Sequence, residues 1–156
     1  MKKGASAMKR TLVALCLAAF FAAPSFAAEM STAPTDPAAL QKLAEEGDSN
    51  AQLNLGNYYA TPHNAAPDHE QAAIWYRKAA EQGNAEAQYR LGSLYYRGKG
   101  GLRQSYEDAY FWFILAAKAG SRPFAVDRDE TARHLTDEQT EAVQKRVDDW
   151  KPVIRN

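Results

Sequence analysis

The sequence predicts an all-α fold, a short right-handed α-solenoid of antiparallel helix hairpins with capping helices at its C-terminal end. The first observation is that Gly47, Gly83 and Gly120 lie 36 and 37 residues apart. The second is that Trp75 and Trp112 each precede their glycine by 8 positions. The third is that the segments around two of the glycines are similar, AEEGDSNAQLNLGNYY and AEQGNAEAQYRLGSLYY. A repeat period in the thirties is typical of stacked helical hairpins.

The first 27 residues have the pattern of a secretory signal peptide. Four basic residues, two of them Lys9 and Arg10, precede 12 apolar residues at 12–23, and small side chains stand at Ser25 and Ala27. A membrane anchor is the alternative, but 12 apolar residues fall short of the roughly 18–20 that a spanning helix needs. We therefore expect cleavage near Ala27, a periplasmic or secreted mature protein, and no stable membrane anchor. Either Met1 or Met8 could be the initiating methionine.

Charge and cysteine content narrow the class of partner. Without residues 1–27 the chain has 15 Lys and Arg against 19 Asp and Glu, a net of −4, and no basic run. This balance gives no electrostatic case for binding nucleic acid or anionic lipid. The single cysteine, Cys16, lies inside the apolar run after Leu15, which is too large for the usual lipoprotein signal. The mature chain would then have no cysteine, so its stability must come from packing.

A flexible leader is expected over residues 28–35, and the first two helices follow it. Asp36 and Pro37 suit the N-cap and the first helical position, and Gly47 can end the helix with a positive φ. Asp48 to Asn50 then cap a second helix that runs to about Ala60. The residues expected to face inward in these helices are Ala39, Leu40, Leu43, Ala44, Ala51, Leu55, Tyr58 and Tyr59.

The next two helices enclose the most regular part of the pattern. After a loop at 61–67 that holds two prolines, Asp68 caps a third helix that ends at Gly83. Asn84 caps a fourth helix, Ala85–Arg97, in which Gly92 allows a neighbouring helix to approach closely. The residues expected inward are Ala72, Ile74, Trp75, Ala79 and Ala80 in the third helix, and Ala87, Leu91, Leu94 and Tyr95 in the fourth.

The last three helices are predicted to close the array. The fifth, Tyr106–Ala119, has nine consecutive apolar residues at 109–117 and must be covered on more than one side. A sixth helix is expected over Phe124–Leu135. Thr136 and Gln139 make a capping box that opens a seventh, whose inward stripe is Val143, Val147 and Trp150.

The segment WYRKAAEQGNAEAQYRLGSLYY at 75–96, with GKG at 98–100 and YEDA at 106–109, resembles the Sel-one-like repeat. That family is related to the tetratricopeptide repeat, and the resemblance covers about residues 38–120. It implies a tetratricopeptide-like repeat region at 36–120, made of two repeats and a flanking helix. The segment LTDEQTEAVQKRVDDW at 135–150 resembles the capping helix of such proteins, which gives C-terminal capping helices at 121–151. The resemblance implies a protein-interaction scaffold without catalytic residues.

The sequence offers no persuasive catalytic, metal or cofactor site. His63, Asp68, His69 and Glu70 are close in sequence, but a zinc site needs three or four converging ligands, and Asp68 is explained as a helix cap. The glycines of GKGG at 98–101 lack the spacing and the preceding strand of a phosphate loop. Acidic clusters such as Asp127, Asp129 and Glu130 are interpreted as solvated helix faces. We expect no metal, no cofactor and no enzymatic activity.

One polar and aromatic stripe is the candidate binding surface. Glu86, Tyr89, Ser93, Tyr96 and Arg97 share one face of the fourth helix, turned away from its core residues. Asn50 and Asn57 match this stripe one repeat earlier. The first helix of each hairpin lines the concave side of a stacked array, and Tyr and Arg are favoured at binding surfaces. An ordinary wet helix face remains the alternative for these residues.

The expected function is therefore a non-enzymatic scaffold that binds a protein or peptide partner through its concave face. Trp75 and Trp112 occupy equivalent places in the repeat, so we expect them in the core rather than in that surface. The alternative is a cell-envelope enzyme, or an accessory of one, that acts on peptidoglycan with aromatic side chains stacked on sugars. Neither the identity of the partner nor the oligomeric state follows from the sequence.

Overall fold

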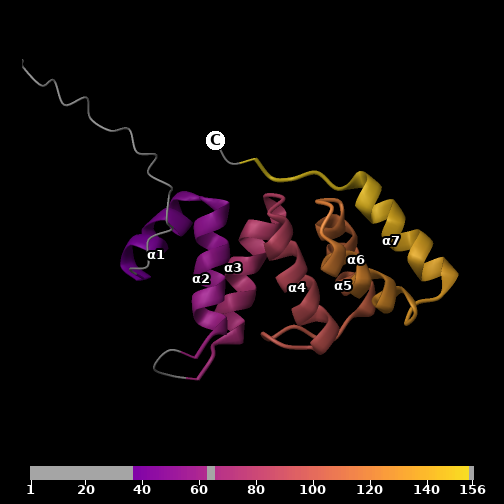
Figure 1. Cartoon of the computed structure of the whole chain (residues 1–156), viewed down its shortest axis with the longest axis horizontal. Helices are drawn as coiled ribbons and strands as arrows, with labels where there is room; N and C mark the ends of the chain where they lie inside the picture. The colour runs from indigo at the N-terminus through magenta and orange to yellow at the C-terminus, as the bar shows by residue number, and fades with distance from the viewer. Residues whose placement is uncertain (1–36, 63–65, 155–156) are drawn as a thin grey trace, which may run out of the picture. The chain divides into compact units, whose positions relative to one another are not determined.

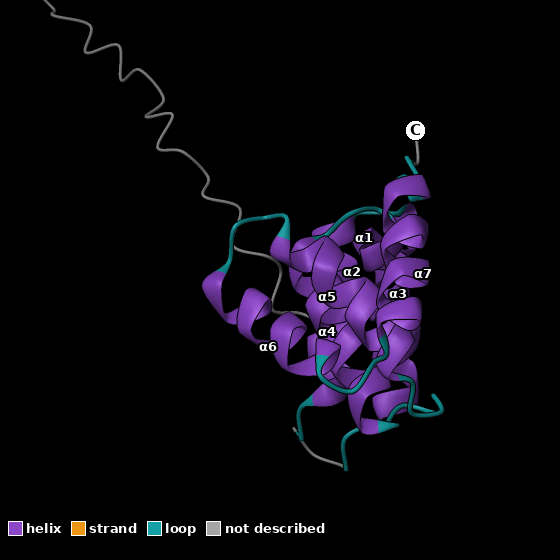
Figure 2. Cartoon of the chain, turned by 90° about the vertical axis from the view of Figure 1, so that its right-hand side faces the viewer, coloured by secondary structure: helices purple, strands orange, loops and turns teal. Residues whose placement is uncertain are grey.

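The computed structural model describes residues 37–62 and 66–154 of the chain. In these ranges it contains seven helices and no strand, as Figures 1 and 2 show. The expected signal peptide and leader, together with His63, lie outside the described residues. The helices are α1 (Pro37–Glu46), α2 (Ser49–Ala60), α3 (His69–Glu81), α4 (Ala85–Arg97), α5 (Tyr106–Ala117), α6 (Arg122–Ala132) and α7 (Asp137–Asp149).

Helices that are consecutive in sequence pack against one another from α1 to α6, which confirms the predicted all-α hairpin architecture. The hairpin of α2 and α3 and the hairpin of α4 and α5 are the two sequence repeats. Only α7 breaks this order, because it packs on α5 rather than on α6. None of the described helices is long and apolar enough to span a membrane.

Local hydrogen bonds explain why the helices begin where the sequence predicts. The Asp48 carboxylate accepts from the backbone N–H of Ala51 at 2.6 Å, and the Asn84 side chain accepts from Ala87 N–H at 3.0 Å. Thr136 and Gln139 form the reciprocal capping box that opens α7. Each bond satisfies a first-turn N–H that has no partner inside the helix. Gly83, with φ of 90°, ends the α3 segment directly before the Asn84 cap.

The core is formed by small and aromatic residues at equivalent places in the two repeats. Trp75 and Trp112 are 8% and 7% exposed, as predicted. Three inward assignments were wrong: Leu43, Tyr58 and Ile74 are exposed. Ile74 stands two positions from both Ala72 and Tyr76 and therefore lies on the opposite side of α3. Leu43 belongs to α1, which has only α2 as a main neighbour.

The ends of α5 and α6 differ from the prediction by a few residues. Helix α5 ends at Ala117 instead of Ala119, and α6 begins at Arg122 instead of Phe124, because Pro123 suits the first turn of a helix. Helix α6 ends at Ala132 instead of Leu135. The N–H groups of Arg133, His134 and Leu135 bond three residues back, in the tighter pattern of a 3₁₀ turn.

Helix α5 is covered on several sides, as its continuous apolar run requires. Helices α4, α6 and α7 all pack against it, and Figure 2 shows α6 and α7 on opposite sides. Helix α7 is attached through Arg146, which pairs with Asp108 at 3.0 Å and lies 4.7 Å from the centre of the Phe111 ring. Beyond α7 the chain turns back to α3, where the N–H of Val153 donates to the Glu81 carbonyl at 2.8 Å.

Candidate functional site

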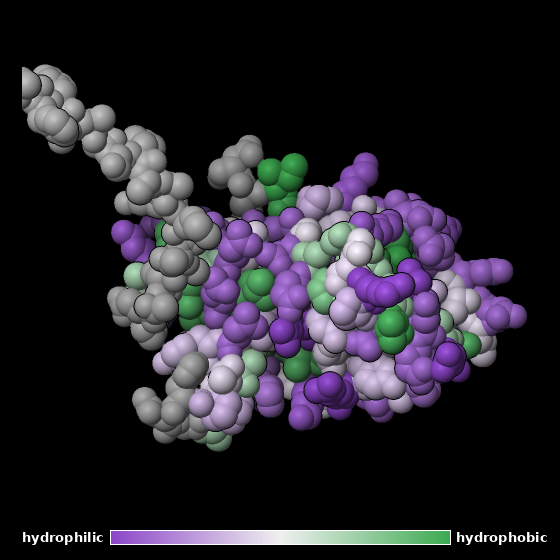
Figure 3. All heavy atoms as spheres, viewed as in Figure 1, coloured by the Kyte–Doolittle hydropathy of each residue, from purple (hydrophilic) through white to green (hydrophobic). Residues whose placement is uncertain are grey.

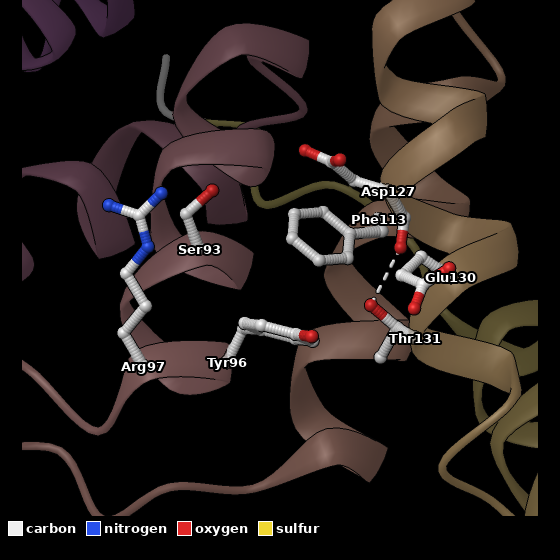
Figure 4. A pocket seen from close by; sticks show the side chains of 7 residues that line it. All are labelled: Ser93, Tyr96, Arg97, Phe113, Asp127, Glu130 and Thr131. Atoms are coloured by element: carbon white, nitrogen blue, oxygen red, sulfur yellow. Dashed lines mark hydrogen bonds between the residues drawn. The ribbon is translucent and has the colours of Figure 1, made fainter.

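A pocket of about 130 Å³ opens between α4, α5 and α6 (Figure 4). It brings together one face of α4, the middle of α5 and one face of α6. On α6 the lining residues are spaced by three and one, so they follow a single helical stripe. The pocket is lined by Ser93, Tyr96, Arg97, Phe113, Asp127, Glu130 and Thr131.

The floor of the pocket is aromatic and buried. Phe113 is 2% exposed, and Figure 4 shows its ring between Ser93 and Asp127. Tyr89 packs against Phe113 with ring centres 5.5 Å apart, and it stacks on Phe124 of α6 at 4.5 Å. The Tyr89 ring therefore joins α4 to α6 next to Phe113. The Tyr96 ring forms another wall and extends toward α6.

Hydrogen bonds fix the polar walls. The Tyr89 hydroxyl donates to the Asp127 carboxylate at 2.6 Å. This bond, with burial adding to it, raises the pKa of the Tyr89 hydroxyl. The Thr131 hydroxyl donates to the Asp127 carbonyl at 2.6 Å, the contact dashed in Figure 4, and the Ser93 hydroxyl donates to the Tyr89 carbonyl at 3.0 Å. The side chains at this wall are thus held in place before any ligand arrives.

The predicted stripe is only partly free to bind. Ser93, Tyr96 and Arg97 meet at the pocket, while Tyr89 is occupied by α6. The other three make internal contacts. Asn50 accepts from Asn84 at 3.1 Å, Asn57 accepts from the Tyr76 hydroxyl at 2.8 Å, and Glu86 pairs with Arg90 at 2.8 Å.

At the place of the pocket, the second repeat carries smaller groups than the first. Asn57 and Tyr76 correspond to Ser93 and Phe113 in the repeat alignment. In the first repeat the Tyr76 hydroxyl reaches the Asn57 amide at 2.8 Å and fills the space between the helices. In the second repeat the hydroxyl is absent and serine replaces the larger asparagine. The space that the first repeat fills with a hydrogen bond is therefore available to a ligand.

The α6 side of the pocket could not be assigned from sequence. The carboxylates of Asp127 and Glu130 look like solvated helix residues in the sequence, and Phe113 and Thr131 look like ordinary core positions. Their convergence depends on how α6 packs against α5 and so reaches the side chains of α4, and the Tyr89–Asp127 bond spans 38 residues. The only local signal was that Asp127, Glu130 and Thr131 share one face of α6.

A second aromatic group adjoins the pocket through Tyr96. The rings of Tyr106 and His134 stack with centres 4.3 Å apart, and Tyr96 meets both of them edge-on. His134 follows α6, so these contacts again join α4 and α5 to the C-terminal part of the chain. They extend the aromatic surface beyond the pocket mouth.

The remaining sequence candidates have structural explanations. The Asp68 carboxylate accepts from Glu70 and Gln71 N–H groups as the α3 cap, at 3.1 and 3.0 Å. No group of three or more His, Cys, Asp or Glu side chains among the described residues could hold a metal ion. The glycines at 98–101 form the turn between α4 and α5, where Gly98 caps α4 with φ of 61°. On the face shown in Figure 3, hydrophilic residues separate small apolar patches.

Comparison with known proteins supports the repeat assignment. The Sel1 repeat profile matches residues 49–84 and 85–121, which are the α2–α3 and α4–α5 hairpins. The fold and these matches define a helical repeat scaffold. The chain belongs to the Sel1 repeat family, as the resemblance implied.

Two solved structures are similar to this chain. One is a protective antigen present in uropathogenic Escherichia coli strains and displaying an SLR fold, with 36% identity and a TM-score of 0.67 over 73% of this chain. The other is a Sel1 repeat protein from Oxalobacter formigenes, with 35% identity and a TM-score of 0.55 over 59% of this chain. The chain spans only 24% and 37% of their respective lengths. No curated protein matches it.

Proposed function

We propose that this protein is a non-enzymatic periplasmic or secreted scaffold that binds a protein or peptide partner at the pocket between α4, α5 and α6. The main support for this proposal is the pocket, because it combines a pre-formed aromatic floor with polar groups at its walls. Ligand sites in proteins are commonly largely pre-formed and apolar, with a few placed polar groups. The predicted stripe contributes Ser93, Tyr96 and Arg97 to this site.

The location of the site in the array also supports a binding role. Helix α4 is the first helix of its hairpin, the position that lines the concave side of a stacked array. Arg97 and Tyr96 are residue types that often dominate interface energies. Arg97 makes no ion pair within the described part of the chain, so its guanidinium is available to a partner.

Site-specific crosslinking in cells of the native source would test this role. A photo-reactive amino acid at Arg97 should give one dominant crosslinked product, to be identified by mass spectrometry. The matched control is the same amino acid at Gln144, an exposed position on α7. Combined Tyr89→Ala and Arg97→Ala substitutions should abolish capture by a probe placed at Ser93. Equal capture from Arg97 and Gln144 would remove this face from consideration.

Two further measurements address compartment and activity. Fractionation with N-terminal sequencing should find the mature chain in the periplasm or medium, beginning after Ala27. Purified protein should neither bind insoluble peptidoglycan nor release muropeptides from it. Release of muropeptides would instead favour the envelope-enzyme alternative.

A further inference from the structure

Some of the charged side chains around the pocket have an oppositely charged partner, and others do not. Two carboxylates of α6 are paired with nearby arginines. Asp129 pairs with Arg128 of the same helix at 2.7 Å, and Glu130 pairs with Arg133, just after the helix, at 2.7 Å. The Asp127 carboxylate accepts a hydrogen bond from the Tyr89 hydroxyl but has no cationic partner among the described residues. The α6 wall therefore presents an unpaired carboxylate beside the Phe113 ring.

The opposite wall carries the complementary charge. Arg97 is exposed on α4 and has no acidic partner in the described ranges, and Figure 4 shows its guanidinium beside Ser93, directed away from α6. Between the two unpaired charges lie the Tyr96 ring and the small part of the Phe113 ring that is exposed. Aromatic faces attract ammonium and guanidinium groups, and carboxylates form strong charge-assisted hydrogen bonds with them.

We propose that the pocket, in the peptide-binding role proposed above, receives a lysine or arginine side chain of the partner, while Arg97 pairs with an acidic group beside it. The methylene stem of the basic side chain lies against Phe113 and Tyr96. Its charged end meets Asp127, with Glu130 nearby at the rim. The recognised chemistry is thus a basic residue next to an acidic one in an extended peptide segment.

The first repeat shows why the equivalent position between α2, α3 and α4 lacks such a site. There the Tyr76 hydroxyl donates to Asn57, and Arg90 is the residue that aligns with Asp127 in the sequence. A basic side chain would find no room there, and the nearby Glu86 carboxylate is already paired with Arg90 at 2.8 Å. The site therefore belongs to the junction of α4, α5 and α6 and is not a property of every repeat.

An NMR titration with three capped dipeptides tests this proposal. Lysyl-glutamate should shift the amide signals of residues around the pocket, with affinity of about millimolar because the probe is small. Norleucyl-glutamate, which keeps the stem and lacks the ammonium, should bind about tenfold more weakly, as should lysyl-glutamine. Equal shifts with all three probes would overturn the proposal.

Matched variants locate the binding. Asp127→Asn keeps an acceptor for the Tyr89 hydroxyl but removes the charge, and it should weaken lysyl-glutamate binding by about tenfold. Asp129→Asn, on the same helix but already paired with Arg128, should leave binding unchanged. Equal effects of the two variants would contradict a specific role for Asp127.

A filled pocket provides a second, independent measurement. Ser93→Asn combined with Phe113→Tyr transplants the pair of the first repeat and should abolish the shifts, while circular dichroism checks that the variant folds. Unchanged binding in the folded variant would overturn the proposal, and if the variant does not fold, the Asp127→Asn result decides. Partner capture from Arg97 without dipeptide binding would leave the scaffold function standing and refute only this inference.

Discussion

Gly92 of α4 lies against the ring of Phe113 in α5, so close that an added Cβ would come within 2.9 Å of two ring carbons. The first repeat has the same contact between Gly56 and Tyr76, where the added Cβ would come within 2.6 Å of the ring. In both hairpins the missing side chain lets an aromatic ring fill the space between the helices. The glycine is therefore required by packing, although it weakens an isolated helix.

Gly92→Ala should destabilise the protein by about 1–3 kcal/mol, because the extra methyl group overpacks a rigid contact. The added Cβ would also lie 3.3 Å from the Ala109 carbonyl oxygen, a backbone atom that cannot easily move. Urea denaturation would measure the free energy of unfolding. In the combined variant with Phe113→Leu, part of the loss should be recovered. A Gly92→Ala protein more stable than the wild type would show that helix propensity outweighs the packing contact.

Trp75→Ala should lower the free energy of unfolding by about 3–5 kcal/mol, as the deletion of a buried aromatic side chain does. Such a loss is a large part of the roughly 5–15 kcal/mol that stabilises a typical domain. The neighbouring Ile74→Ala is the matched control: Ile74 is 47% exposed, so its loss should cost less than about 1 kcal/mol. Thermal and urea melts of the two variants would test this difference. Similar losses at both positions would contradict the burial pattern of α3.

High pH should weaken the first repeat through Tyr76. Burial raises the pKa of the Tyr76 hydroxyl from the usual 10 to about 12, with the nearby Glu86 carboxylate adding to it and Arg90 opposing it. A raised pKa means that the stabilising contribution is complete below pH 10 and is lost as pH rises toward 12. The loss is about 1.4 kcal/mol per pH unit in that window.

Urea melts at pH 9 and pH 11 would measure this loss. Tyr76→Phe cannot ionise and should show a smaller decrease between the two pH values, although it is less stable at pH 9 because the Asn57 hydrogen bond is gone. The same pH dependence in both proteins would assign the alkaline loss to other groups.

Thr136→Ala should cost about 1 kcal/mol, because it removes the N-cap of α7. The Thr136 hydroxyl accepts from the Gln139 backbone N–H at 3.2 Å, and the Gln139 side-chain carbonyl accepts from the Thr136 backbone N–H. The internal control is Ser121, which occupies the N-cap of α6 without a side-chain cap bond. Ser121→Ala should therefore change the free energy of unfolding by less than about 0.5 kcal/mol. Chemical denaturation of both variants measures this contrast, and equal costs would argue against the capping box.

Most of the fold followed from local patterns in the sequence. The N-caps at Asp48 and Asn84, and the left-handed stops at Gly47 and Gly83, lie within a few residues of the groups that they satisfy or terminate. The inward faces were less reliable, because a one-residue error moves a side chain by about 100° around a helix. Tyr58 and Ile74 were misplaced for this reason.

The candidate binding site also has one part that could be predicted from the sequence and one part that could not. Ser93, Tyr96 and Arg97 could be assigned from spacing on one helix. Asp127 on α6 could not be assigned in this way, because nothing in the spacing of α6 shows how it packs against α5 or which α4 side chains it meets.

The sequence alone thus determined the repeats, the helices and the family to which they belong. Only the tertiary structure decided that α6 and α7 pack on different sides of α5, that Tyr89 is occupied by Asp127, and that a pocket remains beside Phe113. The physical reason is how far apart in the sequence the interacting residues lie. Caps and turns join groups three or four residues apart, whereas the contacts that close the pocket join residues 38 apart, from Tyr89 to Asp127 and from Tyr96 to His134.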